Sequence, residues 1–138
     1  MKPYIHKVQY YETDRMGVTH HSNYIRWMEE ARVQFLEDVG WGYARLEELG
    51  LMSPVIGVTS SHKETTTFDD EVRIEVAICK YNGVRLILEY KMYNNKTDRL
   101  VLTGTTEHCF MTRDFHLVRM KKVLPEFDQL LHELTETH

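Results

Sequence analysis

Residues 10–32 set the order of elements in this chain, and they read YYETDRMGVTHHSNYIRWMEEAR. We interpret them as the end of a strand, a polar loop that contains Asp14 and Gly17, and the longest amphipathic helix of the protein. A helix start offers unpaired backbone N–H groups and the positive end of the helix dipole. A carboxylate in the loop just upstream can lie beside a reacting group that those N–H groups polarise, which suits attack on an acyl carbonyl.

The helix is predicted from apolar residues that recur at helical spacing between Tyr24 and Val39, and Gly40 is a natural C-terminal stop. Its apolar stripe is broad and bulky, which favours deep packing against a sheet. Ser22 or Asn23 is the expected N-cap, because both residue types accept hydrogen bonds from the first turn of a helix.

Most of the remaining chain reads as antiparallel strands. Alternating or apolar runs predict strands at residues 4–11, 55–63, 72–78, 84–92 and 100–111. Asn82-Gly83 predicts a two-residue type I′ hairpin turn, and Pro125 suits the first turn of a closing helix. We therefore expect an α+β fold in which an antiparallel sheet wraps around one long central helix, within one domain spanning residues 1–138.

Composition excludes several classes of protein. Of the 138 residues, 42% are hydrophobic and 28% are charged, and the net charge of −4 does not favour nucleic-acid binding through a broad basic surface. Residues 1–6 lack the apolar core of a signal peptide, and no stretch is apolar for long enough to span a membrane, so we expect a cytoplasmic protein. Cys79 and Cys109 are too few for a disulfide framework, and the histidines lack metal-ligand spacing. We expect no metal and no cofactor.

Several short motifs, read together with the order of elements, resemble a known family. They are Tyr11-Glu12-Thr13-Asp14, Gly17-Val18, His21, Tyr24, Glu29-Glu30-Ala31-Arg32 and Phe68-Asp69-Asp70-Glu71-Val72. The chain resembles the 4-hydroxybenzoyl-CoA thioesterase family, and within it the acyl-CoA thioesterases associated with the bacterial Tol–Pal system. The resemblance covers nearly the whole chain and implies the hotdog fold. Thr65-Thr66 stands where many members carry Pro-Ala, a departure from which we expect no change in chemistry.

The resemblance implies an enzyme that hydrolyses an acyl-CoA thioester to the free acid and CoA. It assigns the catalytic carboxylate to Asp14 and the oxyanion donor to the backbone N–H of His21. The carboxylate can attack the carbonyl as a nucleophile or activate water as a general base, and the sequence leaves both open. Glu29 and Glu30 are the fallback carboxylates, because a second branch of hotdog thioesterases places its carboxylate on the central helix.

Four further residues are candidates for contact with substrate: Gly17, Tyr24, Thr59 and Ser60. Packing in the core is the commoner role for a tyrosine such as Tyr24, and a polar Thr/Ser strand edge needs no function. Asp14 taken alone would be an ordinary turn-forming carboxylate. Its combination with Gly17 and His21 ahead of a buried helix favours catalysis.

The resemblance also implies a homodimer or homotetramer, and a small sheet on one helix leaves exposed strand edges that native proteins pair or cover. Two alternatives stay open, an acyl-carrier-protein thioesterase and a non-catalytic acyl-CoA binding module. A hotdog dehydratase is a further rival, but it needs a histidine and an acid facing each other across a dimer. Four basic residues are candidates to meet the CoA phosphates, although such a run of charge is usually a solvated face: Arg113, Arg119, Lys121 and Lys122.

Overall fold

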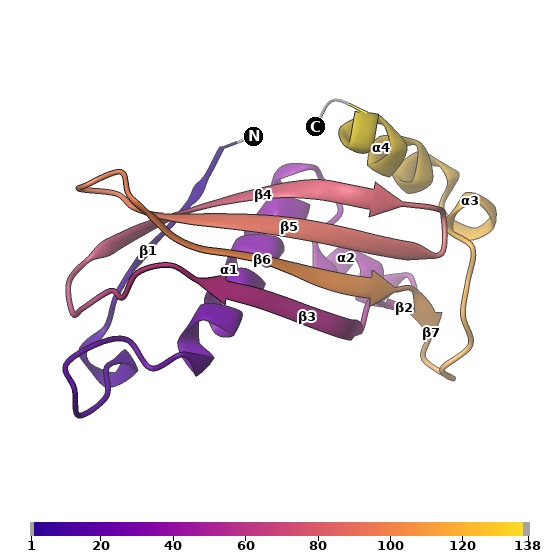
Figure 1. The fold of residues 1–138 in the computed structure, drawn as a ribbon. Coiled ribbons are helices and arrows are strands. Elements are labelled where there is room, and N and C mark those ends of the chain that lie inside the picture. Colours follow the sequence, from indigo (N-terminus) through magenta and orange to yellow (C-terminus); the bar gives the residue numbers. More distant parts are fainter. Residues whose placement is uncertain (1, 137–138) are drawn as a thin grey trace. The chain divides into compact units, whose positions relative to one another are not determined.

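A computed structural model describes residues 2–136 and shows helices and strands in the predicted order (Figure 1). The strands are β1 (Tyr4–Lys7), β2 (Leu51–Met52), β3 (Val55–His62), β4 (Glu71–Tyr81), β5 (Arg85–Asn94), β6 (Leu100–Cys109) and β7 (Met111–Thr112). The helices are α1 (Ser22–Asp38), α2 (Tyr43–Glu48), α3 (Met120–Val123) and α4 (Pro125–Glu136), and residues Tyr10–Glu12 form a short 3-10 helix.

Five of the strands form one antiparallel sheet in the order β1-β4-β5-β6-β3, and β2 pairs with β7 separately. Strand β1 lies antiparallel to β4, with Tyr4 opposite Ile74 and Lys7 opposite Glu71. Helix α1 packs against the five-stranded sheet, as its broad apolar stripe requires. The expected α+β fold, with an antiparallel sheet on one long helix, is confirmed.

Two local predictions near the N-terminus were wrong. Strand β1 ends at Lys7 and not at residue 11, because the next residues close a 3-10 turn. Helix α1 begins at Ser22, so neither Ser22 nor Asn23 is its N-cap. The imidazole of His20 supplies the side-chain acceptor for the first turn instead, since its Nδ1 accepts a hydrogen bond from the Ser22 N–H at 3.2 Å.

The hairpin at Asn82-Gly83 is present, but its turn is not of type I′. Positive φ falls on Gly83, at 90°, and not on Asn82, whereas a type I′ turn needs it at both. The Asn82 Oδ1 accepts hydrogen bonds from the N–H groups of Val84 and Arg85, at 3.0 and 2.7 Å. This side-chain turn lengthens the loop to residues 82–84.

The described residues fall into two compact units. One unit contains the described chain up to Gln34, with Ser60–Val76 and Tyr90–Gly104. Its buried core includes Val8, Tyr24, Trp27, Met28, Ala31, Val72, Ile74, Tyr90, Met92, Val101 and Leu102. All of the contacts discussed below for Asp14 lie within this unit.

The other unit contains Phe35–Thr59, Ala77–Glu89 and the described chain from Thr105 onward. Its buried core includes Phe35, Leu36, Trp41, Leu46, Leu51, Ile78, Leu86, Leu88, Phe110, Met120, Phe127 and Leu131. Pro125 begins α4, as predicted for a residue without a backbone N–H. Over residues 2–136, no helix has both the length and the apolar character needed to cross a membrane.

Candidate active site

The loop that joins the 3-10 helix to α1 is held by its own backbone hydrogen bonds. Thr13 and Thr19 form an isolated antiparallel bridge. Inside it, the Asp14 N–H donates to the Val18 carbonyl at 2.8 Å, and the Gly17 N–H donates to the Asp14 carbonyl at 3.0 Å. Gly17 has φ of 83°, which side-chain-bearing residues rarely adopt, so this position requires glycine for the turn itself.

This loop forms one wall of a cavity of about 310 Å³. Three of the predicted site residues line it, namely Asp14, His21 and Tyr24. The remaining lining residues are Met16, Val18, Thr19, His62, Lys63, Glu64 and Thr65. The cavity therefore collects side chains from the loop, the start of α1 and the segment that follows β3.

Asp14 is half-buried, and only one of its two carboxylate oxygens accepts a hydrogen bond from the described residues. Its Oδ1 accepts a hydrogen bond from the Met16 N–H at 2.8 Å, so Asp14 does form the turn expected of an ordinary loop aspartate. Its second oxygen, Oδ2, has no hydrogen-bond partner among residues 2–136. That oxygen is available to a substrate or a water molecule in the cavity.

The backbone N–H of His21 is also unoccupied. His21 directly precedes α1, and none of the described residues accepts a hydrogen bond from its N–H. At this position the N–H lies at the positive end of the helix dipole. The His21 imidazole is exposed and stacks on the ring of His20, with the ring centroids 4.3 Å apart. A carboxylate and an unpaired N–H on one cavity are the two parts that acyl transfer needs.

Tyr24 forms a buried wall of the cavity and ties it to the loop. Its hydroxyl lies 3.1 Å from the Thr66 Oγ1, which in turn lies 2.6 Å from the Thr19 Oγ1. The Thr66 carbonyl also accepts a hydrogen bond from the Thr19 N–H at 2.8 Å. The Tyr24 ring packs edge-on against His62, at 5.3 Å between centroids. Thr66, one of the two residues that depart from the family pattern, therefore helps to hold the loop.

Three other predicted residues do not line the cavity. Gly17 acts through its backbone conformation, as described above. The Thr59 hydroxyl bonds to that of Thr105 on the neighbouring strand, and the Ser60 hydroxyl lies 3.2 Å from the His62 Nε2. Both Thr59 and Ser60 are exposed. No contact described here gives either of them a role toward substrate.

The fallback carboxylates on α1 also lie off the cavity lining. Glu29 is exposed. Glu30 accepts a hydrogen bond from the Tyr4 hydroxyl at 2.6 Å, and the same oxygen lies 3.0 Å from the His6 Nδ1. Both neighbours belong to β1, so Glu30 braces α1 against that strand.

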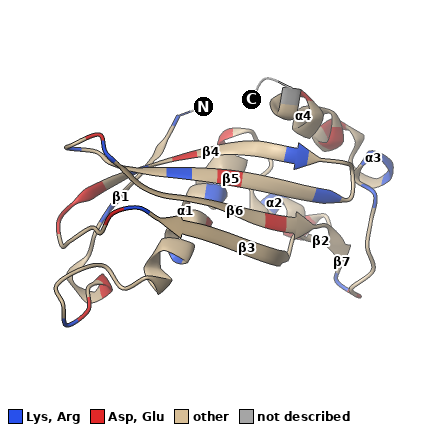
Figure 2. Ribbon diagram, in the orientation of Figure 1, with Lys and Arg blue, Asp and Glu red and all other residues tan. Residues whose placement is uncertain are grey.

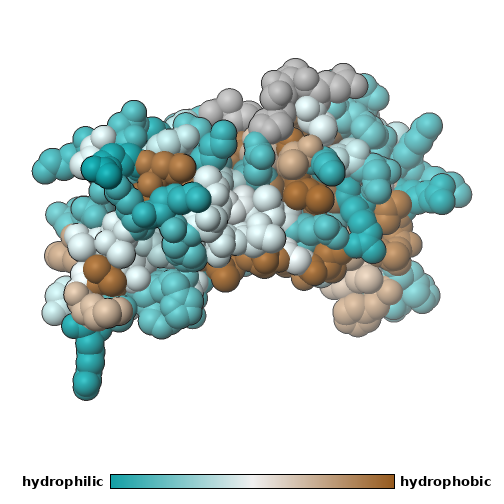
Figure 3. Space-filling model, in the orientation of Figure 1, coloured by the Kyte–Doolittle hydropathy of each residue, from teal (hydrophilic) through white to brown (hydrophobic). Residues whose placement is uncertain are grey.

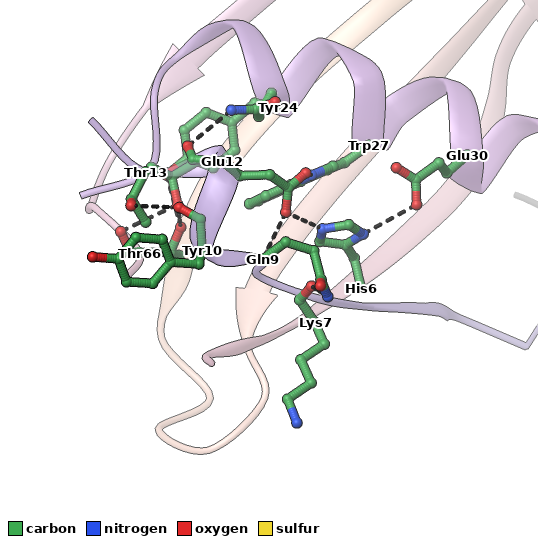
Figure 4. A network of polar contacts seen from close by, with 12 residues as sticks. His6, Lys7, Gln9, Tyr10, Glu12, Thr13, Tyr24, Trp27, Glu30 and Thr66 are labelled. Carbon is green, nitrogen blue, oxygen red and sulfur yellow. Dashed lines mark hydrogen bonds and ion pairs between the residues drawn. The ribbon is translucent and has the colours of Figure 1, made fainter. Parts of the chain in front are cut away.

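A buried polar cluster, not predicted from the sequence, is centred on Glu12, two residues before Asp14 (Figure 4). Glu12 is only 5% exposed. Its Oε2 accepts a hydrogen bond from the Trp27 indole at 2.7 Å, and its Oε1 accepts one from the Gln9 N–H at 2.8 Å. The His6 Nε2 lies 2.8 Å from the same Oε1. Donors from β1, from the residue before the 3-10 helix and from α1 thus converge on one carboxylate.

The cluster changes the pKa of two of its members. Burial alone raises the pKa of the Glu12 carboxyl, but the hydrogen bonds from Gln9, Trp27 and His6 outweigh it, and the pKa is lowered below its usual value. Glu12 is therefore ionised at neutral pH and acts as a fixed acceptor. Burial, reinforced by the Glu30 carboxylate, raises the pKa of the Tyr4 phenol to about 12.

Comparison with known proteins shows the family of this chain. The family model described as "Thioesterase-like superfamily" matches residues 8–129. A protein of Bacillus subtilis (strain 168) named "Putative acyl-CoA thioesterase YneP" is 31% identical over 122 residues, which cover 88% of each chain.

Solved structures show the same fold. A DHNA-CoA thioesterase from Staphylococcus aureus has a TM-score of 0.93 and 29% identity, and the match covers 98% of this chain and 91% of that one. A gentisyl-coenzyme A thioesterase has a TM-score of 0.81 and 23% identity, with coverage of 90% and 99%. These likenesses confirm the predicted hotdog fold. The chain belongs to the thioesterase-like superfamily, and its enzyme class is that of a thioester hydrolase.

Proposed function

We propose that this protein is an acyl-CoA thioesterase, which hydrolyses an acyl-CoA thioester to the free acid and CoA. The observation that carries the proposal is the cavity lined by both Asp14, with its unpaired Oδ2, and His21, with its unpaired backbone N–H. The printed names of the relatives from Bacillus subtilis and Staphylococcus aureus support a CoA thioester as substrate.

In the proposed mechanism, the thioester carbonyl oxygen accepts a hydrogen bond from the His21 N–H at the start of α1. This donor stabilises the negative charge that develops on that oxygen, and one such donor lowers the activation barrier by on the order of 3 kcal/mol. Asp14 then has two possible roles. As a nucleophile it attacks the carbonyl carbon, CoA leaves as the thiolate, and water hydrolyses the mixed anhydride. As a general base it takes a proton from the attacking water.

The finer assignments are part of this proposal. Membership in the Tol–Pal branch stays a prediction. The cytoplasmic location and the action of residues 1–138 as one domain also stay predictions. Arg113, Arg119, Lys121 and Lys122 are all exposed, and the last two lie on α3 (Figure 2). We assign none of these four residues to the CoA phosphates.

We further propose that the enzyme is a homodimer joined along β3. This strand ends the sheet order and is paired on one side only, with β6. Its apolar residues Val55, Ile56 and Val58 are 43%, 46% and 41% exposed. Figure 3 shows hydrophobic surface along the lower border of the view, where Figure 1 draws β3. A second copy pairing with this edge would cover it, as native proteins do with long apolar edge strands.

The dimer is tested by measuring the mass of the protein in solution, for the wild type and for Val58→Lys. We expect a dimer for the wild type and a shift toward monomer for the variant, since a lysine on the strand opposes edge pairing. The matched control is Thr97→Lys, in the exposed loop between β5 and β6. A wild-type monomer would remove this part of the proposal.

The activity is tested by a thiol-release assay over a panel of acyl-CoAs of several aliphatic lengths, together with 1,4-dihydroxy-2-naphthoyl-CoA as an aryl member. We expect release of CoA from at least one of them. Faster turnover of the same acyl groups on acyl-carrier protein would favour the carrier-protein alternative. Saturable binding of acyl-CoA without turnover anywhere in the panel would favour the binding module.

A further inference from the structure

The carboxylate of Glu12 cannot be replaced by an amide without loss of a hydrogen bond. The Trp27 indole and the Gln9 backbone N–H can only donate, and they reach different oxygens of the carboxylate, Oε2 and Oε1. A glutamine at this position has one acceptor oxygen and one NH₂ group, so one of these donors would face another donor. In a site that is 5% exposed, water does not repair such a mismatch.

The backbone of Glu12 is bound as firmly as its side chain. Its carbonyl oxygen accepts a hydrogen bond from the His20 N–H at 2.8 Å and a second from the buried Asn23 Nδ2 at 2.9 Å. His20 directly precedes His21 in the loop, and Asn23 is the second residue of α1. Glu12 is therefore a junction: its side chain is held by Trp27 on α1, and its carbonyl holds the residues on either side of His21.

We propose that Glu12 is a positioning residue for the Asp14–His21 pair, setting the separation between the Asp14 carboxylate and the His21 N–H. This inference rests on the proposed function. Asp14 lies two residues after Glu12. His21 lies one residue after His20, whose N–H donates to the Glu12 carbonyl. A shift of Glu12 is therefore transmitted to Asp14 through the chain and to His21 through the hydrogen bond from His20. Rate depends steeply on such a separation, because a misplacement of about 1 Å can cost on the order of 100-fold.

A positioning role predicts a loss of rate without a matching loss of substrate binding. For Glu12→Gln we expect kcat to fall by about 10- to 100-fold, with KM changed by less than about 3-fold. Trp27→Phe removes the indole donor to the same carboxylate, together with part of a fully buried ring, and leaves the other two donors in place. We expect a smaller loss of kcat, about 3- to 10-fold. This variant carries the test if Glu12→Gln does not fold.

The matched control is Tyr4→Phe, which deletes one hydrogen bond at the far end of the same cluster, the bond from Tyr4 to Glu30. We expect it to lower the unfolding midpoint in urea while kcat stays within about 2-fold of the wild type. Hydrogen exchange of the His20 amide provides a readout that does not depend on activity. It should speed up in Glu12→Gln and Trp27→Phe, and stay unchanged in Tyr4→Phe.

Asp14→Asn is measured alongside to separate the two proposals. If Asp14→Asn is inactive while folded Glu12→Gln retains wild-type kcat, the positioning role is wrong and the proposed function stands. If Tyr4→Phe lowers kcat as much as Trp27→Phe does, the cluster acts only through stability, and the positioning role is again wrong. If the wild type turns over no acyl thioester, the proposed function fails, and unchanged His20 exchange in Glu12→Gln would overturn the positioning role separately.

Discussion

Glu12 and Asp14 are two carboxylates separated by one residue, and their surroundings are opposite. Glu12 is buried, and its two oxygens meet donors from Trp27, Gln9 and His6. Asp14 is half-buried, and one of its oxygens has no partner within residues 2–136. The same chemical group is fully occupied by the protein at one position and half available at the other.

The backbone N–H groups of His20 and His21 show the same contrast. The His20 N–H donates to the Glu12 carbonyl, whereas the adjacent His21 N–H has no acceptor in the described chain. A polar group whose hydrogen bonds are all made holds structure, and one left incomplete beside a cavity can receive a ligand. The hydrogen-bonded groups, the Glu12 carboxylate and the His20 N–H, therefore hold the site. The groups without a partner among residues 2–136, the Asp14 Oδ2 and the His21 N–H, are the ones that can react.

The strongest test of this contrast is Asp14→Asn. Asparagine keeps an Oδ1 that can accept the Met16 N–H, so the turn should persist, but it is neither a nucleophile nor a base. We expect kcat to fall by about 10²- to 10⁴-fold, with the free energy of unfolding within about 0.5 kcal/mol of the wild type. Thiol release and urea unfolding measure the two quantities. Wild-type turnover in the folded variant would remove Asp14 from the mechanism.

Unlike Asp14→Asn, Glu12→Gln should lose stability as well as rate. We expect the free energy of unfolding to fall by about 2–3 kcal/mol at pH 7, because a buried donor loses an ionised acceptor. The loss should depend on pH. Since the pKa of Glu12 in the folded protein is below its usual value of 4.5, its contribution is complete above about pH 4.5 and disappears as pH falls through the folded value.

Urea unfolding of the wild type and Glu12→Gln between pH 7 and pH 3.5 measures this dependence, and the other carboxylates cancel in the difference. The gap between the two proteins should narrow below about pH 4.5. A gap that stays constant down to the lowest pH would mean that the Glu12 carboxylate is not held by these donors in solution.

The fold was predictable where the pattern of burial is regular. Alternation over Val72, Ile74 and Ile78 marks β4 because these side chains share one buried face. Local turns were less predictable, because competing hydrogen bonds decide them. At Asn82 the side chain captures two backbone N–H groups and changes the type of turn. At the start of α1 the imidazole of His20 displaces the expected cap.

The candidate site also contains residues that the sequence predicts and one that it does not. Asp14 and His21 were predictable because they lie in one contiguous stretch with a recognisable spacing, and the structure brings both to one cavity. Glu12 belongs to the same stretch but was not singled out, because its partners His6 and Trp27 come from different elements. The one local indication was a glutamate three residues after Gln9, the spacing with which a side chain returns to the first N–H of a helix.

His21→Ala tests which part of His21 matters. The variant keeps the backbone N–H at the start of α1 and removes an exposed imidazole that stacks on His20. Because the oxyanion donor is preserved, we expect kcat to stay within about 10-fold of the wild type, far less than the effect of Asp14→Asn. A loss as large as that of Asp14→Asn would instead place the imidazole in the chemistry.

The smallest expected effect on activity concerns Tyr4, which lies at the edge of the hydrogen-bonded cluster around Glu12. Its phenol donates to Glu30 and has a pKa raised to about 12, from 10.0, by burial and by that carboxylate. The contribution of this hydrogen bond to stability is therefore complete below about pH 10 and is lost as pH rises through 12. Activity at neutral pH should not change in Tyr4→Phe.

An absorbance titration of phenolate measures this, as the difference between the wild type and Tyr4→Phe, with circular dichroism to confirm that the fold persists. The difference curve should have its midpoint near pH 12. Tyr11→Phe is the reference, because Tyr11 is 80% exposed and lies outside the cluster. A midpoint near 10.0 for Tyr4 would mean that its bond to Glu30 is open in solution. Within residues 2–136, the His6 Nδ1 would then be the remaining hydrogen-bond partner of the Glu30 Oε1.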